Sequence, residues 1–148
     1  MTTREDVFST LFETLSAVTW GSDEDEGQTW AHASRRLALF ADVAQPAMML
    51  TAHDETIRQR AGGDYTQSWK ASVLIYHQTG DVSAIPQQTD NLILDAVFAA
   101  LAPDDALGRN FTLGGRVSRC FVDGAVRKFP GDLDGQSMIV IPITIVVP

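Results

Sequence analysis

Residues 138–147 read MIVIPITIVV, and this stretch decides the fold. Its odd-numbered positions are isoleucine or valine throughout, and its even-numbered positions are apolar except for Thr144. A strand with one face in water alternates apolar and polar side chains. A strand that is apolar on both faces therefore predicts that a helix, another sheet or a neighbouring subunit covers each face. Pro142 lacks the N–H that a sheet uses and predicts an edge position or a bulge.

Two segments before this strand carry apolar side chains at helical spacing. Residues 3–18 predict a core-facing helix, and Thr3 with Asp6 three residues later matches a capping box. Residues 90–102 predict a second helix, which Pro103 ends. The apolar stripes consist of Val7, Phe8, Leu11, Phe12, Leu15 and Val18 in the first helix, and of Leu94, Val97, Phe98 and Leu101 in the second.

Three further segments predict strands, at residues 46–51, 69–77 and 115–123, and residues 29–39 are predicted to contain another. Residues 53–68 are polar and predict a long hairpin loop, with Gly62 and Gly63 at its turn. The order is helix, three strands, helix, two strands. We therefore expect one α+β domain over residues 1–148, with a mixed or antiparallel five-stranded sheet and two main helices packed against it.

The charge of the chain narrows the function classes. Its formal net charge is −8, which argues against general nucleic-acid binding because phosphate contacts need clustered lysine and arginine. Residues 1–26 hold seven acids and one base, whereas residues 109–128 hold five bases and one acid. This asymmetry predicts either two differing solvated faces or a head-to-tail contact in which the acidic side of one copy meets the basic side of the next.

The sequence carries neither a transmembrane nor a secretory pattern. Every apolar run falls short of the ~20 residues that cross a bilayer, and the start MTTREDVFST is polar, unlike a signal peptide. Cys120 is the one cysteine of the chain, so it has no partner for an internal disulfide. It lies within a predicted strand, without a nearby histidine to activate it, and we expect it to act as a small buried hydrophobe.

No motif in the sequence predicts catalysis, a cofactor or a metal. The three histidines, His32, His53 and His77, lie in different elements, without the paired spacing of a metal site. Residues 112–115 (TLGG) match neither a Walker loop nor a dinucleotide fingerprint. The acidic loop 21–27 (GSDEDEG) lacks the spacing of an EF-hand. We therefore expect no catalytic, cofactor-binding or metal-binding residue, and no enzymatic activity.

Five segments, taken in their order and spacing, carry a resemblance to a known family. They are SRRL with the following DV and QPA (34–37, 42–43 and 45–47), WKASVLIYHQTG (69–80), NLILDAVFAALAP (91–103), TLGGRVSRCFVDG (112–124) and VIPITIVVP (140–148). With these segments the chain resembles the tail terminator (minor tail) proteins of long-tailed bacteriophages and related gene-transfer particles.

The resemblance implies a small α+β subunit that joins copies of itself in a hexameric ring. Such a ring caps the tail tube protein, ends tail polymerisation and offers a surface to the head–tail connector or neck proteins. DNA only passes through its lumen, and no membrane is contacted. The implied location is the head-proximal end of the virion tail, after assembly in the host cytoplasm, and the family has no catalytic residues.

Two sets of residues are candidates for the contacts of such a ring. The hairpin loop is predicted to touch the tail tube or line the lumen, through Arg58, Arg60, Gly62, Gly63 and Asp64. The subunit interface is predicted to use the basic segment and the last strand, through Arg116, Arg119, Arg127, Lys128, Ile141 and Ile143. Ring closure fits these assignments because a heterologous interface gives a ring when its rotation closes.

Two other interpretations stay open. A head-side neck or tail-completion protein would have a similar size and also form rings. A small α+β enzyme or ligand-binding domain would instead have a pocket between the sheet and a helix. Its lining residues would be Trp30, Trp69 and Tyr76, although packed aromatic side chains of this kind more often belong to a core.

Overall fold

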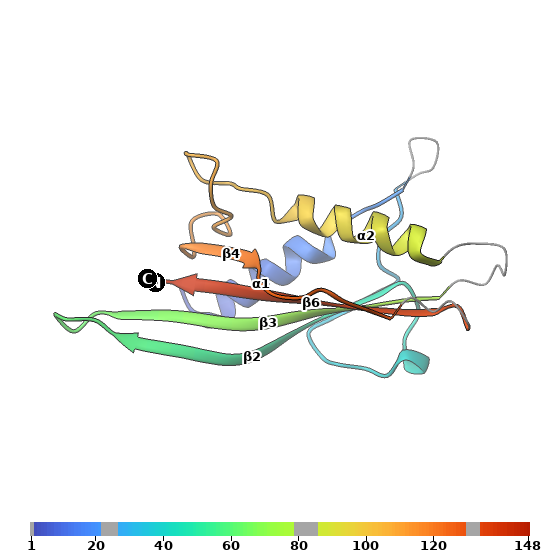
Figure 1. Cartoon of the computed structure of the whole chain (residues 1–148), viewed down its shortest axis with the longest axis horizontal. Coiled ribbons are helices and arrows are strands. Elements are labelled where there is room, and N and C mark those ends of the chain that lie inside the picture. The colour runs from blue at the N-terminus through green and yellow to red at the C-terminus, as the bar shows by residue number, and fades with distance from the viewer. Residues whose placement is uncertain (1, 22–26, 79–85, 130–133) are drawn as a thin grey trace.

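A mixed sheet runs the length of the molecule (Figure 1). The computed structural model describes residues 2–21, 27–78, 86–129 and 134–148, so the four consecutive acids predicted in a loop at 23–26 lie outside the described residues. The strands are β1 (His32–Ser34), β2 (Ala47–Gln59), β3 (Tyr65–Gln78), β4 (Arg119–Val122), β5 (Arg127–Phe129) and β6 (Gln136–Val147). They lie in the order β1-β2-β3-β6-β4, and β5 pairs with β6 on the side that β4 also uses. β1 and β2 are parallel and the other pairs antiparallel, which confirms the α+β class with six strands instead of five.

Both helices, α1 (Arg4–Ser16) and α2 (Pro86–Ala100), pack on one face of the sheet (Figure 1). The capping box predicted for α1 is confirmed. The Thr3 hydroxyl accepts from the Asp6 N–H at 3.1 Å, and the Asp6 carboxylate accepts from the Thr3 N–H at 2.9 Å. α2 begins at Pro86 rather than at Asp90. A proline suits that first position because the first N–H groups of a helix have no intrahelical partner.

The main core lies between the helices and the inner face of the sheet, which we define as the face that the helices cover. Cross-strand partners share a face, and the buried pairs are Ile139 with Ile75, Ile141 with Val73, Ile143 with Ala71 and Ile145 with Trp69. Burial of one such aliphatic side chain contributes about 1.5–3 kcal/mol. The odd-numbered face of the last strand is therefore covered, as the sequence predicts.

The opposite face of the sheet, the outer face, is covered in part by the chain itself. At one end Ala47, Met49 and Tyr76 pack with Phe40 of the short 3₁₀ turn η1 (Phe40–Asp42). Elsewhere on this face the β6 side chains Val140, Pro142 and Val146 are half-buried. The described chain thus buries one face of β6 and covers the second face in part, where the sequence predicted cover on both.

Pro142 lies in an interior strand, so its predicted edge position is wrong. β6 pairs with β3 on one side, where Pro142 stands opposite Ser72, and with β4 and β5 on the other. The Pro142 carbonyl accepts from the Asp123 N–H at 3.1 Å. The N–H and C=O of one strand residue face the same side of the strand. The nitrogen of Pro142 therefore faces the gap between the end of β4 and the start of β5. No strand pairs with Pro142 in this gap, so the sheet needs no N–H donor there and tolerates the proline.

The segment predicted as a hairpin loop, residues 53–68, is mostly strand, so that prediction is wrong. β2 runs on to Gln59 and β3 begins at Tyr65. The turn between them is short, with the Arg60 N–H donating to the Asp64 carbonyl at 2.6 Å. The residues were mistaken for a loop because a ribbon exposed on both faces lacks the apolar alternation that identifies a buried strand.

One predicted strand is shorter than expected. β4 begins at Arg119 rather than at Gly115, whereas β1 lies within the segment that was predicted to contain it. The residues before β4 form a turn instead, held by Asp104, whose carboxylate accepts from the N–H groups of Thr112 at 2.6 Å and Gly114 at 2.9 Å. Side-chain acceptors of this kind compete with strand pairing for the backbone donors.

Candidate interaction sites

The hairpin of β2 and β3 forms an arm that extends beyond the helices and beyond the C-terminal end of β6 (Figure 1). We define the hairpin arm as residues 53–65, all of which are exposed. An isolated two-stranded ribbon is marginally stable in water. The arm therefore depends on the sheet, from which its two strands extend, for its ordered shape.

The base of the arm is tied to the start of α1. The Arg4 guanidinium donates to the Glu55 carboxylate at 2.9 and 3.0 Å and to the Gln67 side chain at 3.1 Å. It also lies over the Trp69 ring, 5.2 Å from the centroid. The hydrogen bond from Arg4 lowers the pKa of Glu55. These contacts orient the base of the arm with respect to the core.

The strand register places two large apolar side chains on the same face of the arm. Glu55 pairs with Trp69, Ile57 with Gln67 and Gln59 with Tyr65, so Ile57 and Tyr65 share the inner face with the buried Trp69. Their positions are diagonal across the ribbon, a spacing that long side chains bridge. Ile57 is 52% and Tyr65 54% exposed. This apolar pair continues the inner face of the sheet past the end of the helices.

The residues predicted to touch the tail tube or lumen gather near the tip of the arm. Arg58, Arg60, Gly62, Gly63 and Asp64 are all exposed. The two glycines have φ values of +98° and +91°, and a Cβ at either would meet open space, so the turn needs them for conformation alone. The structure thus brings together the whole set that the sequence proposed.

A groove runs between α2 and the strand β5. It has a volume of about 480 Å³ and is lined by Asn91, Leu94, Asp95, Phe98, Val126 and Lys128. The sequence predicted Phe98 in the core stripe of α2, and this is wrong: Phe98 is 49% exposed, whereas Ile93 and Val97 are fully buried. We call this site the α2 groove. It combines an apolar wall with one acid and one base.

The four basic residues predicted at the subunit interface do not form one patch. Arg119 lies over the ring of Phe121, 4.5 Å from the centroid. Arg127 pairs with Val140 and so faces the outer side, whereas Lys128 pairs with Ile139 and faces the helix side, where it lines the α2 groove. Adjacent strand residues point to opposite faces, so neighbours in sequence are separated in space.

Arg116, the fourth of these bases, lies beside acidic residues of its own chain. Its guanidinium donates to the Leu113 carbonyl at 2.9 Å, and it lines a cavity of about 450 Å³ together with Asp6 and Glu13 of α1. The pKa of Asp6 is lowered chiefly by hydrogen bonds from Thr3, with a contribution from Arg116. Part of the charge asymmetry of the sequence is therefore neutralised within the protomer.

Ile141 and Ile143 were predicted at the subunit interface, and the structure places them in the core of their own protomer. They are 0% and 1% exposed. Their side chains belong to the inner face of β6, under the helices. The prediction is wrong for these two residues because it did not assign which of the two apolar faces of the strand turns inward.

The outer face also carries a polar network across three strands. The Lys70 ammonium donates to the Thr144 hydroxyl at 2.7 Å and lies 3.4 Å from the Asp123 carboxylate. The Thr144 hydroxyl in turn donates to Asp123 at 3.2 Å. This network and the half-buried side chains around Pro142 form a mixed polar and apolar surface.

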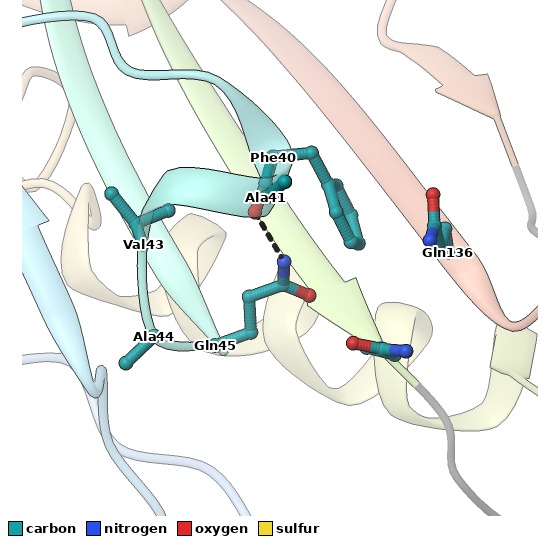
Figure 2. A pocket seen from close by; sticks show the side chains of 7 residues that line it. Phe40, Ala41, Val43, Ala44, Gln45 and Gln136 are labelled. Atoms are coloured by element: carbon teal, nitrogen blue, oxygen red, sulfur yellow. Dashed lines mark hydrogen bonds between the residues drawn. The ribbon is translucent and has the colours of Figure 1, made fainter.

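A second hollow lies beside η1, at the end of the sheet opposite the arm. It has a volume of about 640 Å³ and is lined by Phe40, Ala41, Val43, Ala44, Gln45, Gln78 and Gln136. Figure 2 shows Phe40 and Gln45 on one side of it and Gln136 on the other. The Gln45 amide donates to the Phe40 carbonyl at 2.9 Å, which fixes the side chain within the turn. The glutamines give this hollow a polar lining.

A polar trio is buried between α2 and the sheet. The Ser137 hydroxyl donates to the Asp90 carboxylate at 2.9 Å, and the His77 imidazole lies 3.8 Å from that carboxylate. Burial lowers the pKa of His77 and raises the pKa of Asp90. This trio was not predicted, because Asp90 was expected at the first position of the helix, whereas α2 begins four residues earlier, at Pro86. The spacing of Asp90 could have indicated that it is buried, because it stands three residues before Ile93 and so lies on the same face of the helix.

The remaining groups with potential chemistry are packed into the fold. Burial raises the pKa of Cys120 to about 12, so its thiol stays protonated at neutral pH. Trp69 stacks on Phe8, Trp30 donates to the Leu15 carbonyl at 2.9 Å, and Tyr76 lies on the outer face. These three aromatic residues do not line one pocket. Within the part of the chain that the structure describes, no three His, Cys, Asp or Glu residues are grouped to hold a metal ion.

The fold and its surfaces define a small α+β protein with a single helix-covered sheet and a projecting arm. No family model matches the chain, and no curated protein matches it. Neither of the two described helices is long and apolar enough to cross a membrane.

Proposed function

We propose that this protein is a tail terminator: a structural virion subunit that forms a ring on the tail tube, ends tail polymerisation and joins the tail to the head. The proposal rests on the resemblance of the sequence segments to that family and on the α+β fold. In this role the protein acts by shape and charge, without catalysis, cofactor or metal. Its partners are copies of itself, the tail tube protein and the connector or neck proteins, with DNA passing through the lumen.

The observation that carries the proposal is the hairpin arm. All of its residues are exposed, and two large apolar side chains on it, Ile57 and Tyr65, are about half-exposed. A monomer gains nothing in stability from such an arm, since buried apolar area supplies the folding free energy. A subunit of an assembly uses it to reach a tube, a lumen or a neighbouring copy.

The partly covered outer face of the sheet supports the same role. β6 has apolar side chains on both faces, and those of its inner face are buried under the helices. Half-buried Val140, Pro142 and Phe121 lie on the other side, beside Arg119 and Arg127. Two different surfaces, an arm at one end and a sheet face along the middle, fit a subunit with unlike contacts on its two sides.

The alternative of a head-side neck or tail-completion protein predicts a different partner. Such a protein binds filled heads, whereas a terminator binds the ends of tail tubes. The alternative of a ligand-binding or enzyme domain drew on Trp30, Trp69 and Tyr76, and the packing of these residues into separate clusters gives it no support.

The test has two parts, solution mass and partner binding. Light scattering over a range of protein and salt concentrations is expected to give a species of about six subunits at high protein concentration. Purified tail tubes of the same particle are expected to bind the protein at one end, as seen by electron microscopy, and polymerising tubes are expected to stop at a defined length.

Specific outcomes contradict the proposal. Binding to isolated filled heads, with none to tubes, favours the neck protein. A protein that leaves tube length unchanged and binds neither particle is not a terminator. The charge-reversed variant Arg58→Glu with Arg60→Glu is expected to weaken joining. The matched control is Arg36→Glu with Arg109→Glu, because both of these bases are exposed and neither belongs to the arm or to the outer face of β6.

A further inference from the structure

The strand register gathers bases on the outer face of the sheet. This face carries the even-numbered side chains of β3 and β6 and the residues that pair with them. Among the strand pairs that the structure describes, it holds four exposed bases and no acid. The bases are Arg58 of β2, Lys70 of β3, Arg119 of β4 and Arg127 of β5. The paired strands therefore present a basic surface, although the chain has a net charge of −8.

Acids near this face lie at its margins and offset part of its charge. Asp123, directly after β4, lies 3.4 Å from the Lys70 ammonium and balances it. Asp54 lies in the bulge of β2, between its two registers with β3. Asp42 of η1 and Asp134 before β6 lie at the end of the sheet opposite the arm. The middle of the face, along β6, therefore keeps its positive charge.

The bases form a row that follows β6. Arg119 and Arg127 stand opposite Val146 and Val140, six residues apart, which is about 20 Å at the rise of a strand. This length corresponds to about six base pairs of duplex DNA at 3.4 Å each. Half-buried hydroxyl side chains share the face, at Thr66, Ser68 and Ser72 of β3. Arginine and lysine together with serine and threonine hydroxyls are the side chains that contact a phosphate backbone.

We infer that the outer face of the sheet contacts the phosphate backbone of duplex DNA, chiefly through Arg119 and Arg127. Both described helices lie on the inner face (Figure 1), so the outer face presents no helix to read bases in a groove. Contacts to phosphate alone are independent of sequence and let DNA slide, which suits a duplex in transit. The inference rests on the proposed function, and it assigns the outer face to the lumen of the ring.

Binding to free DNA tests the inference. A short fluorescein-labelled duplex of mixed sequence is titrated with the whole chain, and fluorescence anisotropy follows the binding over a series of salt concentrations. We expect the logarithm of the affinity to fall against the logarithm of the salt concentration with a slope of about −2 to −3, since each phosphate contact contributes about −0.9. Duplexes of unrelated sequence are expected to bind alike. Absence of binding at low salt overturns the inference.

Arg127→Glu and Lys128→Glu are a matched pair of variants. The residues are adjacent in sequence, and the register places Arg127 on the outer face and Lys128 on the inner face. Arg127→Glu is expected to lower the affinity about fivefold or more and the salt slope by about 1, whereas Lys128→Glu is expected to change the affinity less than about twofold. Arg119→Glu repeats the comparison against Arg109→Glu, which lies between α2 and β4. Equal losses within both pairs overturn the inference.

The other possible occupant and the proposed function are tested separately. Labelled polyglutamate is a second probe, and binding as tight as that of DNA overturns the inference in favour of an acidic protein partner. DNA binding through the outer face, in a protein that neither forms rings nor caps tubes, supports the DNA contact and overturns the terminator. Rings that cap tubes but show no affinity for DNA overturn the DNA contact and leave the terminator in place.

Discussion

At the residue scale, the buried trio of Asp90, His77 and Ser137 shows how a fold changes the properties of single groups. Asp90 is buried, and burial opposes its ionisation more than the hydrogen bond from Ser137 and the nearby charges favour it, so its pKa rises. Burial lowers the pKa of His77, with Asp90 opposing the shift. The protein therefore buries a carboxylate whose ionisation costs stability, and this cost depends on pH.

The first prediction concerns Asp90→Asn. Because the folded-state pKa of Asp90 lies above its unfolded value, the folded state binds the extra proton and the stability is lost as pH rises through the folded pKa. The amide keeps an acceptor for Ser137 and cannot ionise. We expect the variant to exceed the wild type in free energy of unfolding at neutral pH, and the gain to vanish as pH falls toward the unfolded pKa of Asp.

Urea denaturation at several pH values measures this difference. Asp95→Asn, on the exposed side of the same helix, is the matched control for the loss of one carboxylate from α2. The lowered pKa of His77 has the opposite effect on the pH dependence of stability, because the free energy of unfolding falls as the pH drops below 6.5, the pKa of an unfolded histidine. A pH-independent gain at Asp90 would show that the carboxylate is not desolvated.

At the element scale, α2 shows how one turn of helix separates core from surface. Val97 is fully buried, and the next residue, Phe98, is half-exposed in the α2 groove. The buried stripe consists of Asp90, Ile93 and Val97, three and four residues apart, so a helix of 3.6 residues per turn points Phe98 to one side. The sequence predicted both residues in the core because Leu94, Val97, Phe98 and Leu101 recur at helical spacing.

The second prediction compares Val97→Ala with Phe98→Ala. Removal of the buried methyl groups of Val97 leaves a cavity and is expected to cost about 1–3 kcal/mol of unfolding free energy. Phe98→Ala is expected to cost less than about 1 kcal/mol in the isolated protomer, although it removes more atoms, because half of the ring is already in water. Denaturation of both variants at low protein concentration gives the comparison, and an equal cost would place Phe98 in the core.

At the scale of the whole molecule, the structure divides into a folded body and an arm that contributes little to it. The body holds the inner-face core under both helices, and β2 begins and β3 ends in it. The arm extends the same two strands into water, past the last β6 pair of Gln67 with Val147. Folding and association can therefore be altered separately.

The third prediction removes the tip of the arm. Residues 59–65 are replaced by Asn-Gly, which closes a two-residue hairpin turn between the paired residues Arg58 and Thr66. We expect the thermal midpoint to change by no more than about 2–4 °C, since the removed residues are all exposed. Association measured by light scattering is expected to be lost. A large fall in the midpoint would show that the arm is part of the folded core.

The sequence by itself determined the class of the fold, because helical spacing in two segments and apolar runs in others leave few arrangements that bury both. It located the first capping box and the glycine turn of the hairpin. It could not assign which apolar face of the last strand turns inward, since both faces are nearly equal in composition. The interpretation of this sequence as that of a tail terminator stays a prediction.

The tertiary structure decided where the surfaces are. Ile141 and Ile143 are buried, and Phe98 is half-exposed. Arg127 and Lys128 lie on opposite faces of the sheet, and Arg116 lines a cavity with two acids of α1. The polar segment predicted as a loop is a pair of strands. The physical reason is that exposure depends on what lies opposite each side chain, and partners such as Trp69 and Glu55 come together only through long-range strand pairing and helix packing.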